Sequence, residues 1–272
     1  MHDVDTADHH PTADIWQHSA YESQCAPRGL QGRPLIWLVD PERPGPYGDA
    51  QLLSEAERDR AARMLRVGMR RQYVAAHALL RVKLSEQLGI APALIQFRTG
   101  RHGKPELARN CGLHFSVSHT HGLVGCAISH GVPIGLDLER IRPLDAVALS
   151  PAVLDSAEQA DVAAKRGQQR WQRFLQYWTL KEATLKLHGV GMLVAPTEIA
   201  VAWPPDTGPR LTRTPDQLPA CHHQLRHWQL HRASKGPSKI KSILLGPLPP
   251  AEWVASSVRQ ESLARRQGGA MT

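Results

Sequence analysis

The sequence predicts an α+β fold built from two similar halves. Helix and strand patterns occur in blocks instead of alternating strictly, which is typical of α+β proteins. The order strand, helix, long helix, strand occurs at 34–98 and again at 133–203. The two stretches share no obvious sequence identity, so the repeat is one of pattern. Two halves of this kind leave a cleft between them, which is a common place for a ligand.

The chain of 272 residues divides into four expected segments. Residues 1–33 are polar and unpatterned, so we expect them to be disordered. The N-terminal half is expected at 34–130 and the C-terminal half at 131–260. The last segment, 261–272, is expected to be a disordered tail.

In the N-terminal half, PLIWLVD at 34–40 is predicted to be a short buried strand. Ser54 begins a helix, because Ser-Glu-Ala-Glu matches the Ser-x-x-Glu capping box. A second helix is predicted from Met69 to Leu88, with Gly89 as its terminating glycine. Its apolar side chains recur at helical spacing: Tyr73, Ala76, Leu80, Leu84 and Leu88. LIQFR at 94–98 is predicted to be a strand, and TGRHGKPEL after it a glycine-rich loop.

Three successive strands follow, in HFSVS, LVGCAIS and PIGLDLE. Helical patterning returns at 156–165 and again at 168–188, where Gly189 ends the helix. EIAVAW, LRHWQLH and KSILLG are predicted to be late strands. The aromatic side chains of the second long helix lie on one face and are predicted to belong to the core: Trp171, Phe174 and Trp178.

The composition favours an anionic partner. There are 33 basic and 25 acidic residues, which gives a net charge of +8, and such a surface attracts nucleic acid, acidic proteins or phosphorylated small molecules. A bias towards Arg in the genome would explain the charge equally well. The four cysteines lie far apart and form no Cys-x-x-Cys pair, so a zinc or redox motif is not expected. The N-terminus does not resemble a signal peptide, and no apolar stretch is long enough for a membrane span. We therefore expect a cytoplasmic protein without a membrane segment.

Asp137 and Glu139 are two residues apart on a predicted strand, so both side chains point to one face. Adjacent carboxylates repel each other, and a divalent cation such as Mg²⁺ neutralises them efficiently. A solvated strand end would explain the pair equally well.

Glu182 and Lys186 are four residues apart on the second long helix and share a face. Lys181 lies beside them. For this helix taken alone, an exposed salt bridge is the stronger interpretation, and such a pair contributes little stability.

Ser118 and His119 follow a predicted strand, where a turn would expose backbone N–H groups, a hydroxyl and an imidazole to a phosphate. A nucleophilic role for Ser118 is less favoured, because the Gly-x-Ser-x-Gly elbow is missing. A metal site at His119 and His121 is possible, although no third His stands at a ligand spacing. Other basic residues become candidates for phosphate binding only if they surround the same anion. They are Arg70, Arg71, His77 and Arg81 on the first long helix, and Lys104 in the glycine-rich loop.

Taken together and in order, these motifs resemble the Sfp-type 4′-phosphopantetheinyl transferase family. The resemblance covers about residues 34–203. It rests on Gly103-Lys104-Pro105, Phe115-Ser-Val-Ser-His119, Gly135-Leu-Asp-Leu-Glu139, and Trp178-Thr-Leu-Lys-Glu-Ala183 followed by Lys186. It implies two pseudo-symmetric α+β halves with coenzyme A and Mg²⁺ at their interface. It also implies transfer of the phosphopantetheine arm of coenzyme A to a serine of an apo acyl, peptidyl or aryl carrier protein, with 3′,5′-ADP as the co-product.

The resemblance also implies roles for individual residues. Mg²⁺ would be held by Asp137, Glu139 and Glu182, and Asp137 would also lie against coenzyme A. Glu182 is the candidate base, directly or through a water, and Lys186 would neutralise the leaving group. The remaining contacts to coenzyme A would be basic or hydroxyl side chains: Lys104, Ser118 and His119 at the 3′-phosphate with Arg71 or Arg70, Arg81 near the adenine or its phosphate, and Lys181 at the diphosphate.

Two other functions stay open at this point. A basic nucleic-acid-binding protein would account for the Arg-rich helices, although no recognised nucleic-acid motif appears. A metal-dependent phosphohydrolase would use the same acids. We favour carrier protein and coenzyme A as partners, without nucleic acid. We also expect a monomer, because two halves in one chain supply the cleft.

Overall fold

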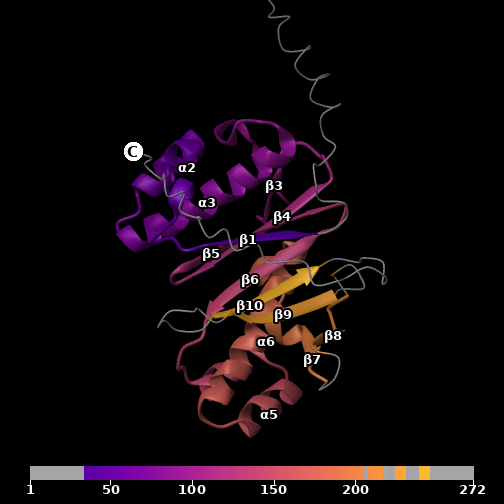
Figure 1. Ribbon diagram of the computed structural model, residues 1–272. Helices are drawn as coiled ribbons and strands as arrows, with labels where there is room; N and C mark the ends of the chain where they lie inside the picture. Colours follow the sequence, from indigo (N-terminus) through magenta and orange to yellow (C-terminus); the bar gives the residue numbers. More distant parts are fainter. Residues whose placement is uncertain (1–33, 205–207, 217, 219–223, 231–238, 246–272) are drawn as a thin grey trace, which may run out of the picture.

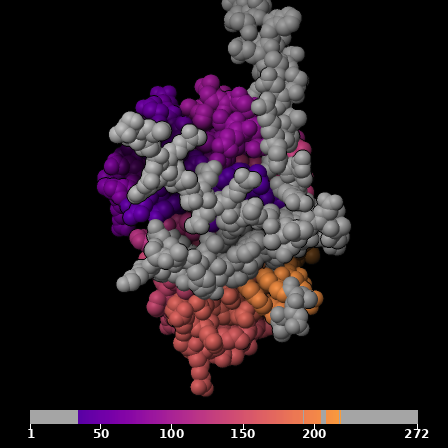
Figure 2. All heavy atoms as spheres, viewed as in Figure 1, coloured from indigo at the N-terminus to yellow at the C-terminus, as the bar shows by residue number. Residues whose placement is uncertain are grey.

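The computed structural model describes residues 34–204, 208–216, 218, 224–230 and 239–245 (Figure 1). The segments expected to be disordered, 1–33 and 261–272, lie outside these residues. The proposed limits of the two halves therefore stay a prediction. We call β1 to β5 the first half and β6 to β10 the second half. In Figure 2 the first half is indigo to magenta, and the helices and hairpin of the second half are mostly salmon to orange.

The first half is a three-stranded antiparallel sheet covered by helices. Its strands run in the order β1-β5-β4, and β2 and β3 form a separate hairpin. Its elements are β1 (Leu35–Val39), α2 (Glu55–Ala62), α3 (Val67–Leu88), β2 (Phe97–Thr99), β3 (Pro105–Leu107), β4 (Leu113–Thr120) and β5 (Leu123–His130), with 3-10 turns at Gly45–Gly48, Ala50–Leu52 and Pro92–Leu94.

The second half repeats this arrangement. Its sheet has the order β6-β10-β9, again first strand, last strand and the strand before it, and β7 and β8 form the matching hairpin. Its elements are β6 (Ile134–Arg140), α4 (Ala146–Val153), α5 (Ser156–Ala164), α6 (Gly167–His188), β7 (Ala200–Ala202), β8 (Arg210–Arg213), β9 (Gln224–Leu230) and β10 (Lys239–Leu245), with 3-10 turns at Gly191–Leu193 and Pro196–Glu198. The predicted α+β fold is confirmed, and so is the repeated pattern of elements.

The two long helices are equivalent position by position. Each has 22 residues, and each ends at a glycine with left-handed backbone, Gly89 with φ 70° and Gly189 with φ 69°. Only glycine adopts this conformation without strain. A residue of α3 therefore corresponds to the residue of α6 numbered one hundred higher.

A buried ion pair anchors each long helix at the same position. Arg81 is 2% exposed, and its Nε donates to Glu57 at 2.5 Å while its Nη1 donates to the carbonyl oxygens of Pro92 and Ile95. Its counterpart Lys181 is fully buried.

Lys181 donates to Glu158 at 2.5 Å and to the carbonyl oxygens of Val153 and Pro196. Glu57 and Glu158 occupy equivalent positions. Each is the third residue of its helix, α2 or α5, and completes the capping box at the helix start. The pair ties the preceding short helix, the long helix and the following turn together in each half.

The halves meet where β4 lies against β6. The backbone N–H groups of Leu136, Leu138 and Arg140 donate to the hydroxyls of Ser116, Ser118 and Thr120, at 3.0, 3.1 and 3.2 Å. We call these three hydrogen bonds the hydroxyl seam. Alternate side chains of β4 point to one face. Their three hydroxyls accept the hydrogen bonds that main-chain carbonyl oxygens would accept in an ordinary pair of strands. Apolar side chains pack beside the seam in a cluster that includes Ala127, Ile134, Leu136 and Leu138.

Two local predictions were wrong. The strand expected at 94–98 is a 3-10 turn at Pro92–Leu94 followed by β2, because Pro92 starts a helical turn readily. The predicted glycine-rich loop contains β3, since the N–H of Gly100 donates to the carbonyl oxygen of Lys104 at 2.8 Å and closes a tight hairpin. Helix α4 was not predicted. Within the described residues, no helix has the length and apolar character needed to cross a bilayer.

We expect Glu57→Gln to destabilise the fold by about 3 kcal/mol at pH 7, because it leaves the buried Arg81 without a counter-charge. Burial alone would raise the pKa of Glu57, but hydrogen bonds with His77, Arg81 and Ser54 lower it from 4.5 to about 2. A pKa lowered in the folded state stabilises above the unfolded value and is lost as the pH falls towards 2. Urea unfolding at pH 7 and pH 3 should therefore show the difference between wild type and variant shrinking in acid.

The matched control is Glu55→Gln, an exposed position on the same helix. It should change the unfolding free energy by less than about 0.5 kcal/mol. A Glu57→Gln effect that is no larger than this would contradict a stabilising role for the pair.

Candidate active site

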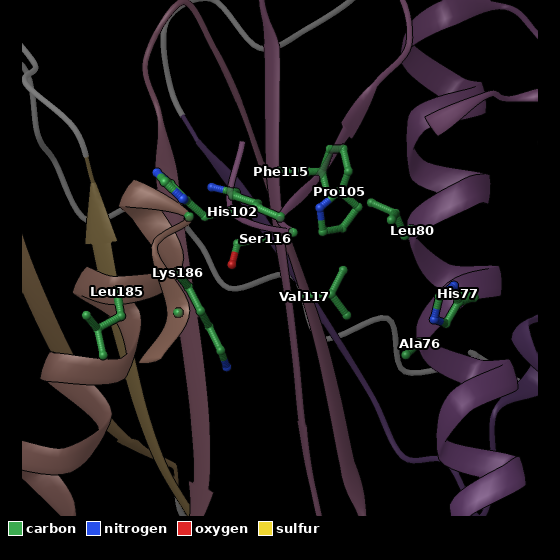
Figure 3. Close-up of a pocket in the computed structure, with 14 residues that line it drawn as sticks. Ala76, His77, Leu80, His102, Pro105, Phe115, Ser116, Val117, Leu185 and Lys186 are labelled. Carbon is green, nitrogen blue, oxygen red and sulfur yellow. The ribbon is translucent and has the colours of Figure 1, made fainter. Parts of the chain in front are cut away.

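A cavity of about 350 Å³ lies between the two long helices. Figure 3 shows Lys186 of α6 on one side, His77 and Leu80 of α3 on the other, and residues of β4 between them. The remaining wall includes Lys104 and Pro105 from the β2–β3 hairpin and Gly189 at the end of α6. Both halves thus contribute to the cavity. The charged side chains of the candidate site lie at its Lys186 end.

Asp137 is the centre of the polar cluster at this end. It is 5% exposed, and its Oδ1 accepts hydrogen bonds from Lys186 Nζ at 2.6 Å and from Ser118 Oγ at 3.0 Å. Its Oδ2 is buried and has no hydrogen-bond partner among the described residues. A buried carboxylate oxygen without a partner is costly, so this atom marks a place where a cation would be favourable.

Glu139 and Glu182 lie in the electrostatic field of Asp137. Burial raises the pKa of Glu139, and the charge of Asp137 raises it further. Burial also raises the pKa of Glu182, again with Asp137 as a contributor and Lys186 acting in the opposite direction. The structure thus joins Lys186 of the helix directly to Asp137 of the strand, and the charge of Asp137 acts on both Glu139 and Glu182.

These carboxylates suit a hard divalent cation. Mg²⁺ prefers oxygen ligands and keeps waters or substrate phosphates in its remaining positions. Among the described residues, no group of three or more His, Cys, Asp or Glu side chains is placed so that it could hold a metal ion as it stands. Lys186 provides the counter-charge to Asp137 instead, and the partnerless Oδ2 is the atom that fits a metal.

Ser118 and His119 lie on opposite faces of β4. The Ser118 hydroxyl is 4% exposed and is engaged by the N–H of Leu138, by Lys186 and by Asp137. It therefore supports the cluster and the seam, and it does not offer a free hydroxyl to a phosphate. His119 is at the surface, where partial burial, then Lys186 and His77, lower the pKa of its imidazole.

Lys104 crosses from the first half to the second. Its Nζ donates to the carbonyl oxygens of Leu187 at 3.1 Å and Ile134 at 3.3 Å. Burial lowers the pKa of this ammonium to about 8. The group still carries most of its charge at neutral pH, at the wall of the cavity.

Three predicted ligands are engaged in ion pairs away from Asp137. Arg81 and Lys181 are consumed by the buried ion pairs of the two halves, so the expected contacts with adenine and diphosphate are corrected to structural roles. Arg71 is exposed and pairs with Glu42 at 2.6 Å.

Sequence reasoning missed two contributors. Trp178, expected only in the core, is half-buried and hydrogen-bonds to the Glu139 carboxylate, which lowers the pKa of that acid. His102 lines the cavity beside Lys104. The Trp-Thr-Leu-Lys-Glu-Ala motif contained the first signal, because its Trp lies one helical turn before Glu182.

The duplicated fold shows which of these residues the architecture requires. Lys181 has a basic counterpart in Arg81, whereas Glu182 corresponds to Val82 and Lys186 to Glu86. The same helix therefore forms without the acid and the lysine of the cluster. Because Glu182 and Lys186 occur only in the second half, their presence indicates a functional role and not a structural one.

Comparisons with known proteins match the chain to one superfamily. Residues 133–241 match the model of the 4′-phosphopantetheinyl transferase superfamily. The chain is 34% identical over 170 residues to the 4′-phosphopantetheinyl transferase HetI of Nostoc sp.. The aligned stretch covers 61% of this chain and 71% of that protein. It is 26% identical to the 4′-phosphopantetheinyl transferase Sfp of Bacillus subtilis, over 52% of this chain and 62% of that protein.

Similar solved structures include a holo-(acyl-carrier-protein) synthase of Thermotoga maritima. It has a TM-score of 0.34 and 15% identity, and the match covers 42% of this chain and 62% of that chain. A holo-(acyl-carrier-protein) synthase of Bacillus anthracis, in complex with CoA (3′,5′-ADP), has a TM-score of 0.32 and 17% identity, over 42% of this chain and 96% of that chain.

If Lys181 is structural, the double variant Lys181→Met/Glu158→Gln should bind coenzyme A within about threefold of wild type, because well-packed neutral replacements of a buried ion pair are often tolerated. Lys186→Met is the matched control, with the same change one turn further along α6. It should weaken binding by about tenfold or more, since a charge-assisted contact to phosphate is lost. Isothermal titration calorimetry measures both. A folded double variant that binds as weakly as Lys186→Met would return Lys181 to the ligand set.

Proposed function

Since the chain belongs to the 4′-phosphopantetheinyl transferase superfamily, we propose that it moves the phosphopantetheine arm of coenzyme A to a serine of an apo carrier protein. The co-product is 3′,5′-ADP. The observation that carries this proposal is the carboxylate cluster of Asp137, Glu139 and Glu182, with its partnerless Oδ2 and the adjacent Lys186. The comparisons give no support to the phosphohydrolase or the nucleic-acid-binding alternative.

Asp137, Glu139 and Glu182 are the residues that would hold Mg²⁺. Bound there, the ion would neutralise charge on the diphosphate of coenzyme A as the leaving phosphate departs. Burial, and then the charge of Asp137, raise the pKa of Glu139 and Glu182, and a bound cation would offset both effects. Phosphoryl transfer depends mainly on positioning and electrostatics, and both are properties of this cluster.

Glu182 is the proposed general base. The carrier serine loses its proton as its oxygen attacks the phosphorus next to pantetheine, and a carboxylate of raised pKa is a better proton acceptor than an ordinary one. Lys186 already donates to Asp137 Oδ1 from the same face of α6. Its ammonium would stabilise the departing phosphate of 3′,5′-ADP.

His119 and Lys104 are proposed to bind the 3′-phosphate, with Arg70 as a further cation, because Arg71 is already paired with Glu42. Lys104 lines the cavity, and His119 is an exposed residue of β4 that lies within the electrostatic influence of Lys186. Ser118 contacts Lys186 and Asp137 from within the seam. The cytoplasmic location and the monomeric state stay predictions.

Asp137→Ala and Glu182→Gln should each reduce transfer by at least about 100-fold, because they remove charge stabilisation and the base. The assay is the mass of an apo carrier protein after incubation with coenzyme A and Mg²⁺, read by mass spectrometry. Glu55→Gln is the control and should retain wild-type activity. EDTA should stop the wild-type reaction, and added Mg²⁺ should restore it. Near-normal transfer by either active-site variant at saturating Mg²⁺ would rule the assignment out.

His119→Ala should weaken coenzyme A by about tenfold while changing 3′-dephospho-coenzyme A little, because a charge-assisted hydrogen bond to the 3′-phosphate is lost. His121→Ala, an exposed histidine in the next turn, is the control. Apparent KM values for both ligands provide the comparison. Equal penalties for the two ligands would place His119 away from the 3′-phosphate.

A further inference from the structure

A second cavity of about 350 Å³ lies next to the first and holds none of the reacting groups of the proposed function. We propose that it is a binding site for a small phosphate-bearing ligand about the size of a mononucleotide. A cavity of this volume is within the range that holds small molecules. The existence of the site follows from its own wall, whereas its effect on coenzyme A rests on the proposed function.

The second cavity lies beside the β2–β3 hairpin, towards the start of β4. Its wall includes Leu113 and His114 of that strand, whereas the first cavity is lined by Ser116 and Val117 further along it and by residues of α3. Within the described part of the chain, no residue of α3 lines the second cavity. The two cavities are therefore different places, and Lys104 belongs to the wall of both.

The wall of the second cavity has an excess of positive charge. Among the described residues that line it, the one acid is Glu106, and that carboxylate is already paired with Arg98 at 2.9 Å. The other charged side chains of the wall are cations: Arg101, Lys104 and Arg109. The wall thus has three more cations than acids. Guanidinium groups match the geometry of phosphate oxygens and bind them through paired hydrogen bonds.

Two titratable groups of the wall show the effect of burial and of this charge. Burial lowers the pKa of Lys104 to about 8, while the charge of Glu106 acts in the opposite direction. Burial also lowers the pKa of His114, and the charge of Lys104 lowers it further. A phosphate bound in the cavity would offset both the burial of the ammonium and its repulsion of the imidazole.

Part of the same wall is apolar. Leu107 and Leu113 are each 8% exposed, Phe115 is 4% exposed, and all three line the cavity. Pockets for small molecules combine such a surface with a few placed polar groups. Arginines beside an apolar surface suit a phosphate attached to a flat organic group better than a free inorganic ion. A nucleotide is therefore the class of ligand that we expect.

Lys104 connects the second cavity to the first. Its side chain lines both, and its Nζ donates to the carbonyl oxygen of Leu187, which directly follows Lys186 in α6. A phosphate in the second cavity and the 3′-phosphate of coenzyme A would therefore interact with the same ammonium. Occupation of the second cavity should weaken the binding of coenzyme A, and by linkage coenzyme A should weaken the second ligand by the same factor.

The test is isothermal titration calorimetry of adenosine 5′-diphosphate and of pyrophosphate, without Mg²⁺, into protein saturated with coenzyme A. We expect one further site, with a lower Kd for the nucleotide than for pyrophosphate because of the apolar wall. Arg101→Gln/Arg109→Gln should raise both Kd values by at least about tenfold, since charge-assisted hydrogen bonds are lost. Arg101→Gln alone, at an exposed position, should raise them by about threefold and serves if the double variant does not fold.

The arginine double variant should keep its Kd for coenzyme A within about twofold, because neither arginine lines the first cavity. The matched control is Arg166→Gln/Arg210→Gln, at two exposed arginines of the second half, and it should change none of these constants. Probe binding that weakens equally in this control is a general effect of charge and overturns the site. A wild-type chain without a further site for either probe overturns it as well.

The coupling is measured by titrating coenzyme A with and without saturating pyrophosphate. Pyrophosphate should raise the Kd for coenzyme A by about fivefold in wild type and leave it unchanged in the arginine double variant. An equal rise in both chains would place pyrophosphate in the first cavity and overturn the coupling. A chain that binds no coenzyme A would contradict the proposed function. Probe binding that is lost in the arginine variant of such a chain would still support the second site.

Discussion

The hydroxyl seam between β4 and β6 is the interaction on which the site depends. Three amide N–H groups of one half are satisfied by three hydroxyls of the other, and a buried amide without a partner would be costly. The register of the seam places Ser118 beside Asp137, so the bond that joins the halves also orients the carboxylate. A slip by one residue would turn the hydroxyls away from the amides and separate Ser118 from Asp137.

A second constraint places α6 directly on β6. A Cβ on Gly135 would lie 2.0 Å from the carbonyl oxygen of Ala183, so only glycine permits this approach. Ala183 follows Glu182 in the helix, and Gly135 lies two residues before Asp137 in the strand. The contact thus brings the acid of the helix to the acid of the strand. Burial raises the pKa of both Glu139 and Glu182, and repulsion by Asp137 raises it further. The close backbone packing is what holds the helix against the strand.

The sequence was sufficient for the long helices and for the core of the cluster. Helical spacing and the terminating glycines located α3 and α6 within two residues, and the predicted proximity of Lys186 to Asp137 is present as a contact of 2.6 Å. It was not sufficient for Lys181 and Arg81. Each is a basic residue in a motif or beside one, and its burial depends on an acid more than 20 residues earlier, Glu158 or Glu57. Pattern alone does not show that such a pair forms. The predicted phosphate contact of Ser118 was missed for a related reason. Its hydroxyl already accepts a hydrogen bond from Leu138, in a strand of the other half.

The internal duplication provides a comparison within one molecule. What both halves share, the buried cation at 81 and 181 and the glycine at 89 and 189, is what this architecture needs in order to fold. What they do not share is distributed unequally. The second half alone has Glu182 and Lys186 on its long helix, and the first half alone has exposed Leu65, Val67 and Met69 before and along its first turn. The cavity therefore lies between two equivalent helices that differ in their reactive side chains. Only the second helix brings a lysine to Asp137 and an acid under the influence of its charge, so the repeated fold provides the scaffold and the unshared residues provide the chemistry.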